Sequence, residues 1–214
     1  MHIPDGFISP QTYLPAAILG AGLLFYGYKK VALDVEKIPM LSGVSAMAFV
    51  MMLIIIPIPG GTTVHLSGIA ILALLFNPWV AFMSISLVLL IQALMFGDGG
   101  VTSYPINMLS LAFLGSFSAY YGYALVKRYS EKYAIFFAGW VSIVIPSLFI
   151  ATILGLQPII ASAEDGTARF FPFGLDVTLP SIVLPHLLLG VLEGLVTVAV
   201  VGFLKTKFKR AFDA

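Results

Sequence analysis

The chain has 214 residues, of which 60% are hydrophobic and only 10% are charged, and its formal net charge is +1. Soluble domains carry about a quarter charged residues, so this composition predicts an all-α, polytopic membrane protein. The nearly neutral charge gives no reason to expect nucleic acid as a partner, and the absence of cysteine excludes thiolate metal sites and disulfides.

The first seven residues, Met1-His2-Ile3-Pro4-Asp5-Gly6-Phe7, form a potential metal chelate. The α-amine of Met1, the deprotonated backbone nitrogen of His2 and the His2 imidazole would close adjacent five- and six-membered rings in one plane. Such a plane leaves one equatorial position open and suits Ni(II) or Cu(II). The alternative is a frayed terminus. Because no basic signal region precedes Lys29, we expect Met1 to remain in the mature protein.

Long hydrophobic runs predict seven helices, since about 20 apolar residues cross a bilayer. These lie near residues 11–28, 39–57, 64–77, 79–96, 104–126, 133–156 and 179–204. The third run is short and could be tilted, re-entrant or completed by the preceding loop. Strands are not expected, because the runs are continuous and do not alternate. We expect a single domain over 1–214, with a metal-chelating segment at 1–10, a helix bundle at 11–204 and a basic tail at 205–214.

The positions of the basic residues predict the orientation of this bundle. Ten of the eleven Lys and Arg residues fall on one side, which is then the cytoplasmic side. They are Lys29, Lys30, Lys37, Lys127, Arg128, Lys132, Lys205, Lys207, Lys209 and Arg210, with Arg169 as the exception. The prediction is a multi-pass protein of the cell membrane with its N-terminus outside and its C-terminus inside. The glycine-rich and histidine-bearing loops then face outward, where we expect a binding site.

Further candidate residues lie in the loops or close to them. His65 follows a Gly60-Gly61-Thr62-Thr63 loop and either supplies the fourth equatorial nitrogen or caps a helix, and Thr63 is a candidate beside the metal. Asp98 lies in a glycine-rich loop and either accepts the second ring N–H of a liganding histidine or forms an Asp-Gly turn. Asn107, near the start of the fifth span, is a weaker supporting candidate. Asp5 is expected to hold a turn.

His186 and Glu193 share the last span and, seven residues apart, lie on one face roughly 10 Å apart. A carboxyl group inside a span marks either a function or a specific pairing. Glu193 could therefore act in the site or be a protonated carboxyl bonded to a neighbouring helix, and His186 could be a supporting or reserve ligand. Two other functions remain open from these residues, a membrane enzyme using the pair and a proton-coupled carrier using Glu193.

Four segments together resemble the NikM/CbiM family, the substrate-binding membrane components of energy-coupling factor transporters for nickel and cobalt. They are residues 1–7, Pro-Gly-Gly-Thr-Thr-Val-His at 59–65, Gln-Ala-Leu-Met-Phe-Gly-Asp-Gly-Gly-Val-Thr at 92–102, and His-x6-Glu-Gly at 186–194. The resemblance implies that Met1, His2 and His65 bind Ni(II) or Co(II) through four nitrogens, with the metal as transported substrate and no organic cofactor.

The resemblance also implies partners in the lipid bilayer and on its inner face. These are a transmembrane coupling subunit, a small membrane subunit and an ABC ATPase, so the chain itself is not expected to be an enzyme. The sequence contains no G-x-x-x-x-G-K-[ST] phosphate-binding loop, which agrees with a separate ATPase. One departure is Ser103-Tyr104-Pro105-Ile106-Asn107, where many relatives carry Leu-Gly-x-Asn, and Pro105 should alter the backbone there.

The choice of metal rests on coordination chemistry. At a given nitrogen site Ni(II) binds more tightly than Co(II), and a square plane favours nickel further. The Pro-Gly-Gly-Thr sequence before the expected site also resembles the nickel branch of the family. We therefore expect nickel, with cobalt as the alternative.

Overall fold

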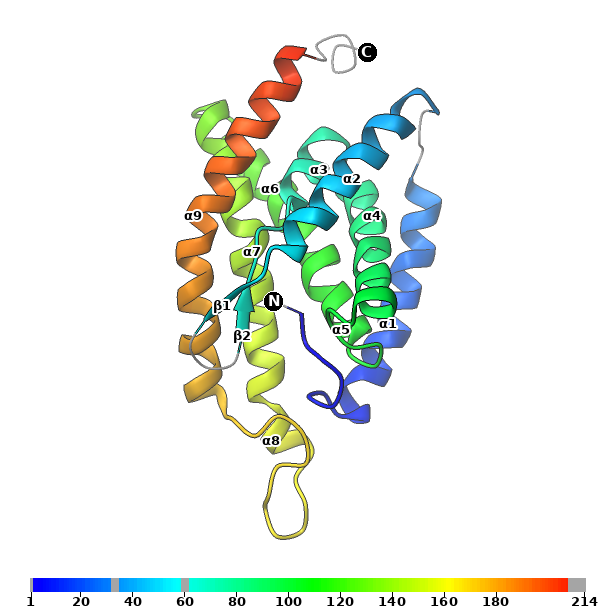
Figure 1. The fold of residues 1–214 in the computed structure, drawn as a ribbon, viewed down its shortest axis with the longest axis vertical. Helices are drawn as coiled ribbons and strands as arrows, with labels where there is room; N and C mark the ends of the chain where they lie inside the picture. Colours follow the sequence, from blue (N-terminus) through cyan, green and yellow to red (C-terminus); the bar gives the residue numbers. More distant parts are fainter. Residues whose placement is uncertain (1, 32–34, 59–61, 208–214) are drawn as a thin grey trace.

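A computed structural model of the chain describes residues 2–31, 35–58 and 62–207. The long helices are α1 (Pro10–Lys30), α2 (Ile38–Leu53), α4 (Pro78–Ile91), α6 (Gly115–Val126), α7 (Glu131–Gly155) and α9 (Leu175–Lys207). Three short helices connect them, α3 (Ile69–Leu75), α5 (Tyr104–Asn107) and α8 (Gln157–Ile160). Two short strands, β1 (Ile56–Ile58) and β2 (Thr62–Val64), lie between α2 and α3 (Figure 1).

The predicted all-α membrane bundle is confirmed. Within the described ranges, five helices are long and apolar enough to cross a bilayer, over 35–53, 78–96, 104–126, 131–160 and 175–207. These match five of the predicted runs closely. The first predicted run forms α1, which is 21 residues long and lies against α4. The chain is therefore a multi-pass membrane protein.

The third predicted run differs most from a complete span. Its helix α3 has only seven residues and is preceded by an extended segment, of which β2 pairs antiparallel with β1. Ile56 lies opposite Val64 in this pairing. Because residues Ile54–Ile58 are all apolar, the hydrophobic pattern of the sequence does not show where α2 ends and where the strand begins. With seven residues, α3 is too short to cross a bilayer by itself.

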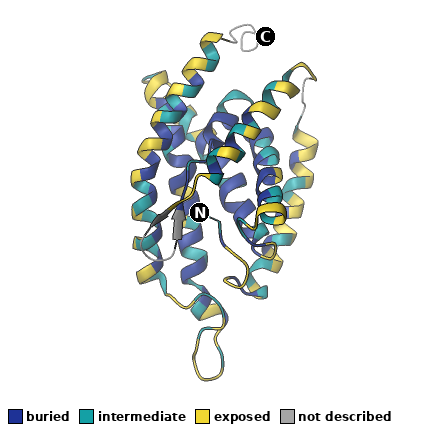
Figure 2. Ribbon diagram, viewed as in Figure 1, coloured by how far each residue is buried: buried dark blue, intermediate teal, exposed yellow. Residues whose placement is uncertain are grey.

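The core of the bundle is centred on α7, which packs against α6 and α9 (Figure 2). Glycines allow the close approach of α7 and α9. A Cβ at Gly139 would lie 2.7 Å from Cα of Gly194, so neither position has room for a side chain. Helix α3 is enclosed as well, with Ile69 to Ala73 fully buried. The extended segment before α3 is thereby held in the interior beside α9.

Two π-helical segments flank the loop at 97–103, and they extend α4 over Gln92–Phe96 and precede α6 over Met108–Leu114. Pro105 lies in the first turn of α5, where a helix needs no N–H from it, so the proline is accommodated without breaking the predicted span. Segments of π-helix are often found at functional sites. This loop is the part of the bundle that contacts the N-terminal segment.

Candidate metal centre

The N-terminal segment folds back into the bundle instead of extending from it. The segment that begins at His2 starts at mid-height of the bundle and runs to the end from which α1 begins (Figure 1). Ile3 and Ile8 are each only 2% exposed. Burying these two side chains favours the folded-back path, because removing a large aliphatic side chain from solvent contributes roughly 1.5–3 kcal/mol. The segment is therefore anchored in the core through Ile3 and Ile8, with residues 4–7 exposed between them, and is not a frayed tail.

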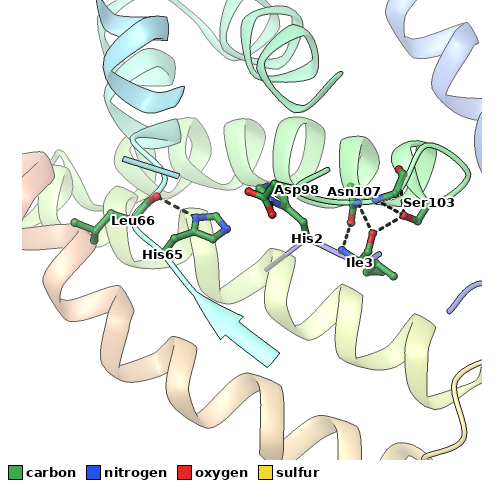
Figure 3. Close-up of polar contacts among 8 residues, drawn as sticks. His2, Ile3, His65, Leu66, Asp98, Ser103 and Asn107 are labelled. Atoms are coloured by element: carbon green, nitrogen blue, oxygen red, sulfur yellow. Dashed lines mark hydrogen bonds and ion pairs between the residues drawn. The ribbon is translucent and has the colours of Figure 1, made fainter. Parts of the chain in front are cut away.

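Asn107 holds the backbone of Ile3 in place through both ends of its amide. Its Oδ1 accepts from the Ile3 N–H at 2.9 Å, and its Nδ2 donates to the Ile3 carbonyl at 3.0 Å (Figure 3). The same carbonyl accepts from the Gly100 N–H at 2.9 Å and from the Ser103 hydroxyl. Because a buried backbone group without a partner is costly, these contacts fix the position of the residue next to His2.

The glycine-rich loop is shaped to let the N-terminal segment approach. Gly99 has a φ of +85°, and a Cβ there would lie 3.2 Å from Cβ of His2. A Cβ at Gly100 would lie 2.3 Å from the backbone nitrogen of Asp5. The Asp5 carboxylate accepts from the N–H groups of Val101 at 3.1 Å and Thr102 at 2.7 Å. The hydrogen bond from the Thr102 hydroxyl is the main reason that the pKa of Asp5 lies below its ordinary value.

The predicted neighbour Asp98 lies beside His2. Its Oδ1 is 2.9 Å from Nδ1 of His2, whose side chain is only 2% exposed, and neither ring nitrogen of His2 is in hydrogen-bond geometry with a partner. Burial is the main reason that the pKa of His2 is lowered. A lowered pKa keeps the imidazole neutral, which is the form that binds a metal.

His65 lies against His2, with ring centroids 4.8 Å apart (Figure 3). Its Nδ1 is 3.1 Å from the Leu66 carbonyl. A carbonyl can only accept, so Nδ1 carries the hydrogen and Nε2 keeps its lone pair. That Nε2 is buried without a hydrogen-bond partner. The structure thus brings together the two histidines that the sequence predicted as ligands, and it leaves nitrogen atoms of both unpaired.

Of the two alternatives that the sequence left open for Glu193, the contacts agree with a specific pairing, although its partner is a turn and not a helix. Its carboxylate is fully buried and accepts three hydrogen bonds, from the Ser67 N–H at 2.9 Å, the Ser67 hydroxyl at 2.8 Å and the Gly68 N–H at 2.8 Å. It therefore anchors the turn between His65 and α3. His186 donates from Nδ1 to the Ile182 carbonyl at 2.7 Å, and its Nε2 is buried without a partner. These contacts do not join His186 and Glu193 into a proton-transfer pair.

Two of the predicted site residues lie outside what the structure describes. They are Met1 and the side chain of Thr63, although the backbone of Thr63 pairs with that of Pro57 in the hairpin. Across the described ranges, no group of three or more His, Asp or Glu side chains is arranged to hold a metal. Backbone and terminal nitrogens are a further class of donor that is compatible with two histidines.

Some residues around the centre were not predicted. Ser103 contacts the Ile3 carbonyl, Ser67 contacts Glu193, and Gln92 is fully buried with neither side-chain polar atom paired. Serine is too common in membrane helices to attract notice by itself. Gln92 does carry a signal, because it is a polar residue in an otherwise apolar run six positions before Asp98.

The sequence is similar to a known protein family and to curated transport proteins. The family model described as "Cobalt uptake substrate-specific transmembrane region", CbiM, matches residues 2–211. The "Probable fused nickel transport protein LarMN" of Lactiplantibacillus plantarum is 36% identical over 211 residues, which cover 96% of this chain and 64% of that protein. The "Fused nickel transport protein NikMN" of Rhodobacter capsulatus is 36% identical over 214 residues, covering 96% of this chain and 62% of that protein.

A solved structure shows the same fold. The structure described as a truncated transition metal transporter has a TM-score of 0.93 and 37% sequence identity to this chain, and the match covers 97% of this chain and 99% of that one. The chain thus spans less than two thirds of the two fused relatives but nearly all of the truncated transporter.

Proposed function

Because the chain belongs to the CbiM family of substrate-specific transmembrane components for cobalt uptake, we propose that it captures a transition-metal ion for transport across the membrane. The proposed substrate is Ni(II), with Co(II) as the alternative. Two relatives named as nickel transport proteins and the order of metal affinities at nitrogen sites support nickel, whereas the description of the family names cobalt.

We further propose that four nitrogens hold the ion in a square plane. They are the α-amine of Met1, the backbone nitrogen and ring Nδ1 of His2, and Nε2 of His65. The observation that carries this proposal is the pair of adjacent histidines in which Nε2 of His65 and both ring nitrogens of His2 are buried without a hydrogen-bond partner. The clamp on Ile3 supports it too, because it holds the backbone next to His2 where a chelate would form.

The proposed chelate requires a rotation of the His2 ring. A six-membered ring closes through Nδ1, and in the structure this atom faces Asp98. A half-turn about the Cβ–Cγ bond would present Nδ1 to the metal and turn Nε2 towards the side on which Asp98 lies. Asp98 would then orient the liganding imidazole, as carboxylates commonly do at metal sites.

The proposed transport is driven by ATP hydrolysis on a separate subunit. The partners would be an ABC ATPase, a transmembrane coupling subunit and a small membrane subunit. The lack of a phosphate-binding loop in the sequence supports a separate ATPase. The fused relatives are longer than this chain, which agrees with a further component joined to them. In the proposed domain organisation, residues 1–10 chelate, 11–204 form the bundle and 205–214 lie in the cytoplasm.

A titration with Ni(II) tests the chelate. Insertion of Leu-Pro between Met1 and His2 moves the amine out of the ring, and because Pro has no N–H the new terminus cannot close a substitute chelate through the inserted backbone. The absorption band of square-planar Ni(II) should therefore be present in the wild type and absent in the variant. Insertion of Leu-Pro after the exposed Glu164 is the matched control and should keep the band. Intact mass measurement verifies that each protein begins at Met1.

Two outcomes of this titration would contradict the proposal. An equal band in the wild type and the Met1 insertion variant would show that the amine is not a ligand. Failure of the wild type to bind either Ni(II) or Co(II) would contradict the proposed function itself. A parallel titration with Co(II) ranks the two metals.

A further inference from the structure

His186 is a third buried histidine, and nothing in the four-nitrogen chelate uses it. Its side chain lies in the interior of the bundle on α9, and the residue is 1% exposed. Since Nδ1 lies 2.7 Å from the Ile182 carbonyl, Nδ1 carries the hydrogen and Nε2 keeps its lone pair. That atom is buried without a partner, although buried polar atoms are nearly always paired. Two of the three histidines, His65 and His186, thus present an unpaired Nε2 in the same tautomer.

The packing of α9 places His186 beside the His65 segment. Val64 belongs to one buried cluster with Leu189 of α9 and Ile143 of α7, against which Leu66 packs. Ser67 and Gly68 bond to Glu193. The segment therefore runs along α9 from Leu189 towards Glu193. His186 lies three residues before Leu189, about 4.5 Å further along the axis towards the end where α9 begins.

His186 is not a member of a metal site built from side chains alone, because within the described part of the chain no group of three or more His, Asp or Glu is arranged to hold a metal.

On the basis of the proposed function, we propose that Nε2 of His186 is a transfer ligand for the metal ion. It binds the ion in passing, between the end of the bundle where α9 begins and the four-nitrogen chelate, and exchanges it with Nε2 of His65. A divalent ion that has lost its water in an apolar interior is unstable without a ligand. An imidazole beside the chelate lowers the barrier for entry and for exit alike, and leaves the equilibrium affinity unchanged.

The substitution His186→Asn tests this role. An Asn side chain retains an N–H near the position of Nδ1 for the Ile182 carbonyl and removes Nε2. Thr178→Val is the matched control, since Thr178 is also buried on α9 with an unpaired side-chain oxygen. Stopped-flow measurements follow loading with Ni(II) and release of Ni(II) to an excess of chelator. We expect both rate constants to fall by about tenfold or more in His186→Asn, with Kd unchanged, and neither to change in Thr178→Val.

Two outcomes of these measurements would contradict the proposal. Unchanged rates would show that the ion does not contact His186. A rise in Kd as large as that of His65→Ala would make His186 a ligand of the bound state and not a transfer ligand. If His186→Asn does not fold, His186→Gln carries the same test. Failure of the wild type to bind metal would contradict the proposed function and is recorded before any variant is measured.

Discussion

The three histidines of the chain differ in what their ring nitrogens contact. In His65 and His186 one nitrogen donates to a backbone carbonyl, which fixes the tautomer and leaves Nε2 free. In His2 the Nδ1 atom faces a carboxylate, and both ring nitrogens lack hydrogen-bond geometry. Because the tautomer of these two rings is fixed, the lone pair on Nε2 is available to a metal ion without a further entropic cost of ordering the ring. His2 must instead turn, and we infer that metal binding orders this ring.

The substitution His65→Ala should weaken Ni(II) binding by more than about 100-fold. Loss of a residue that only supports a ligand usually costs 10- to 100-fold, and His65 is proposed to contribute a ligand atom itself. The measurement is a competition titration against a chelator of known affinity. The optical spectrum should lose its square-planar band at the same time.

His186→Asn serves as the comparison in that titration, because it also removes one buried imidazole nitrogen but is expected to leave Kd unchanged. Thermal unfolding of the metal-free proteins excludes a general loss of structure. A Kd within tenfold of the wild type in His65→Ala would remove His65 from the proposed ligand set.

Among the individual residues, those with distinctive chemistry were predictable and the backbone clamps were not. Asp98 was expected beside His2 or His65, and it lies beside His2. Asn107 was ranked as a weak candidate, yet it bonds both polar groups of Ile3. A sequence does not show which backbone a side-chain amide meets 104 residues away. For the same reason Ser103 was not singled out.

At the scale of elements, the loop at 97–103 and the N-terminal segment fit together as one unit. Asp5 accepts hydrogen bonds from this loop, and Gly100 leaves no room for a side chain beside the Asp5 backbone. Gly100 is therefore required by close approach, whereas Gly99 is required both by its φ of +85° and by its approach to His2. The position of His2 depends on that fit.

Gly100→Ala should weaken metal binding without unfolding the bundle. The added Cβ would lie 2.3 Å from the backbone nitrogen of Asp5, so the N-terminal segment must shift and His2 must shift with it. We expect Kd to rise by about 10- to 100-fold, the range for changes that displace a ligand without removing it. Metal titration and proteolysis of the N-terminal segment measure the effect.

Gly22→Ala is the control for this substitution, since a Cβ at Gly22 meets nothing within 4 Å. It should behave as the wild type in both measurements. An unchanged Kd in Gly100→Ala would mean that the loop yields easily and does not position His2.

The bounds of the long helices were predictable from the sequence to within a few residues. The short elements next to the candidate metal centre were not. Long apolar runs specify a span by length alone, and 104–126 and 78–96 agree with the prediction closely. The paired strands β1 and β2 and the short α3 lie next to a buried anchor, the Glu193 carboxylate that bonds Ser67 and Gly68. A tertiary contact of this kind leaves no periodic pattern in the local sequence.

At the scale of the whole molecule, the basic segments gather at one end of the bundle. The last turn of α1, the beginning of α2, the turn between α6 and α7 and the end of α9 share that end (Figure 1), and Lys205 pairs there with Glu131. The loop between α8 and α9 lies at the opposite end, where Phe171 bonds to the backbone of Phe7. The positive-inside rule then predicts that the loop end faces outward.

Labelling of single cysteines tests this orientation, and the chain suits it because it contains no natural cysteine. Glu164→Cys places a thiol in the exposed loop between α8 and α9, and Arg128→Cys places one in the exposed turn between α6 and α7. A membrane-impermeant maleimide should label Glu164→Cys in intact cells and Arg128→Cys only after the cells are opened. The reverse pattern would place the N-terminal segment on the cytoplasmic half. The metal would then enter from the inside, and an uptake role would be contradicted even if the chelate were intact.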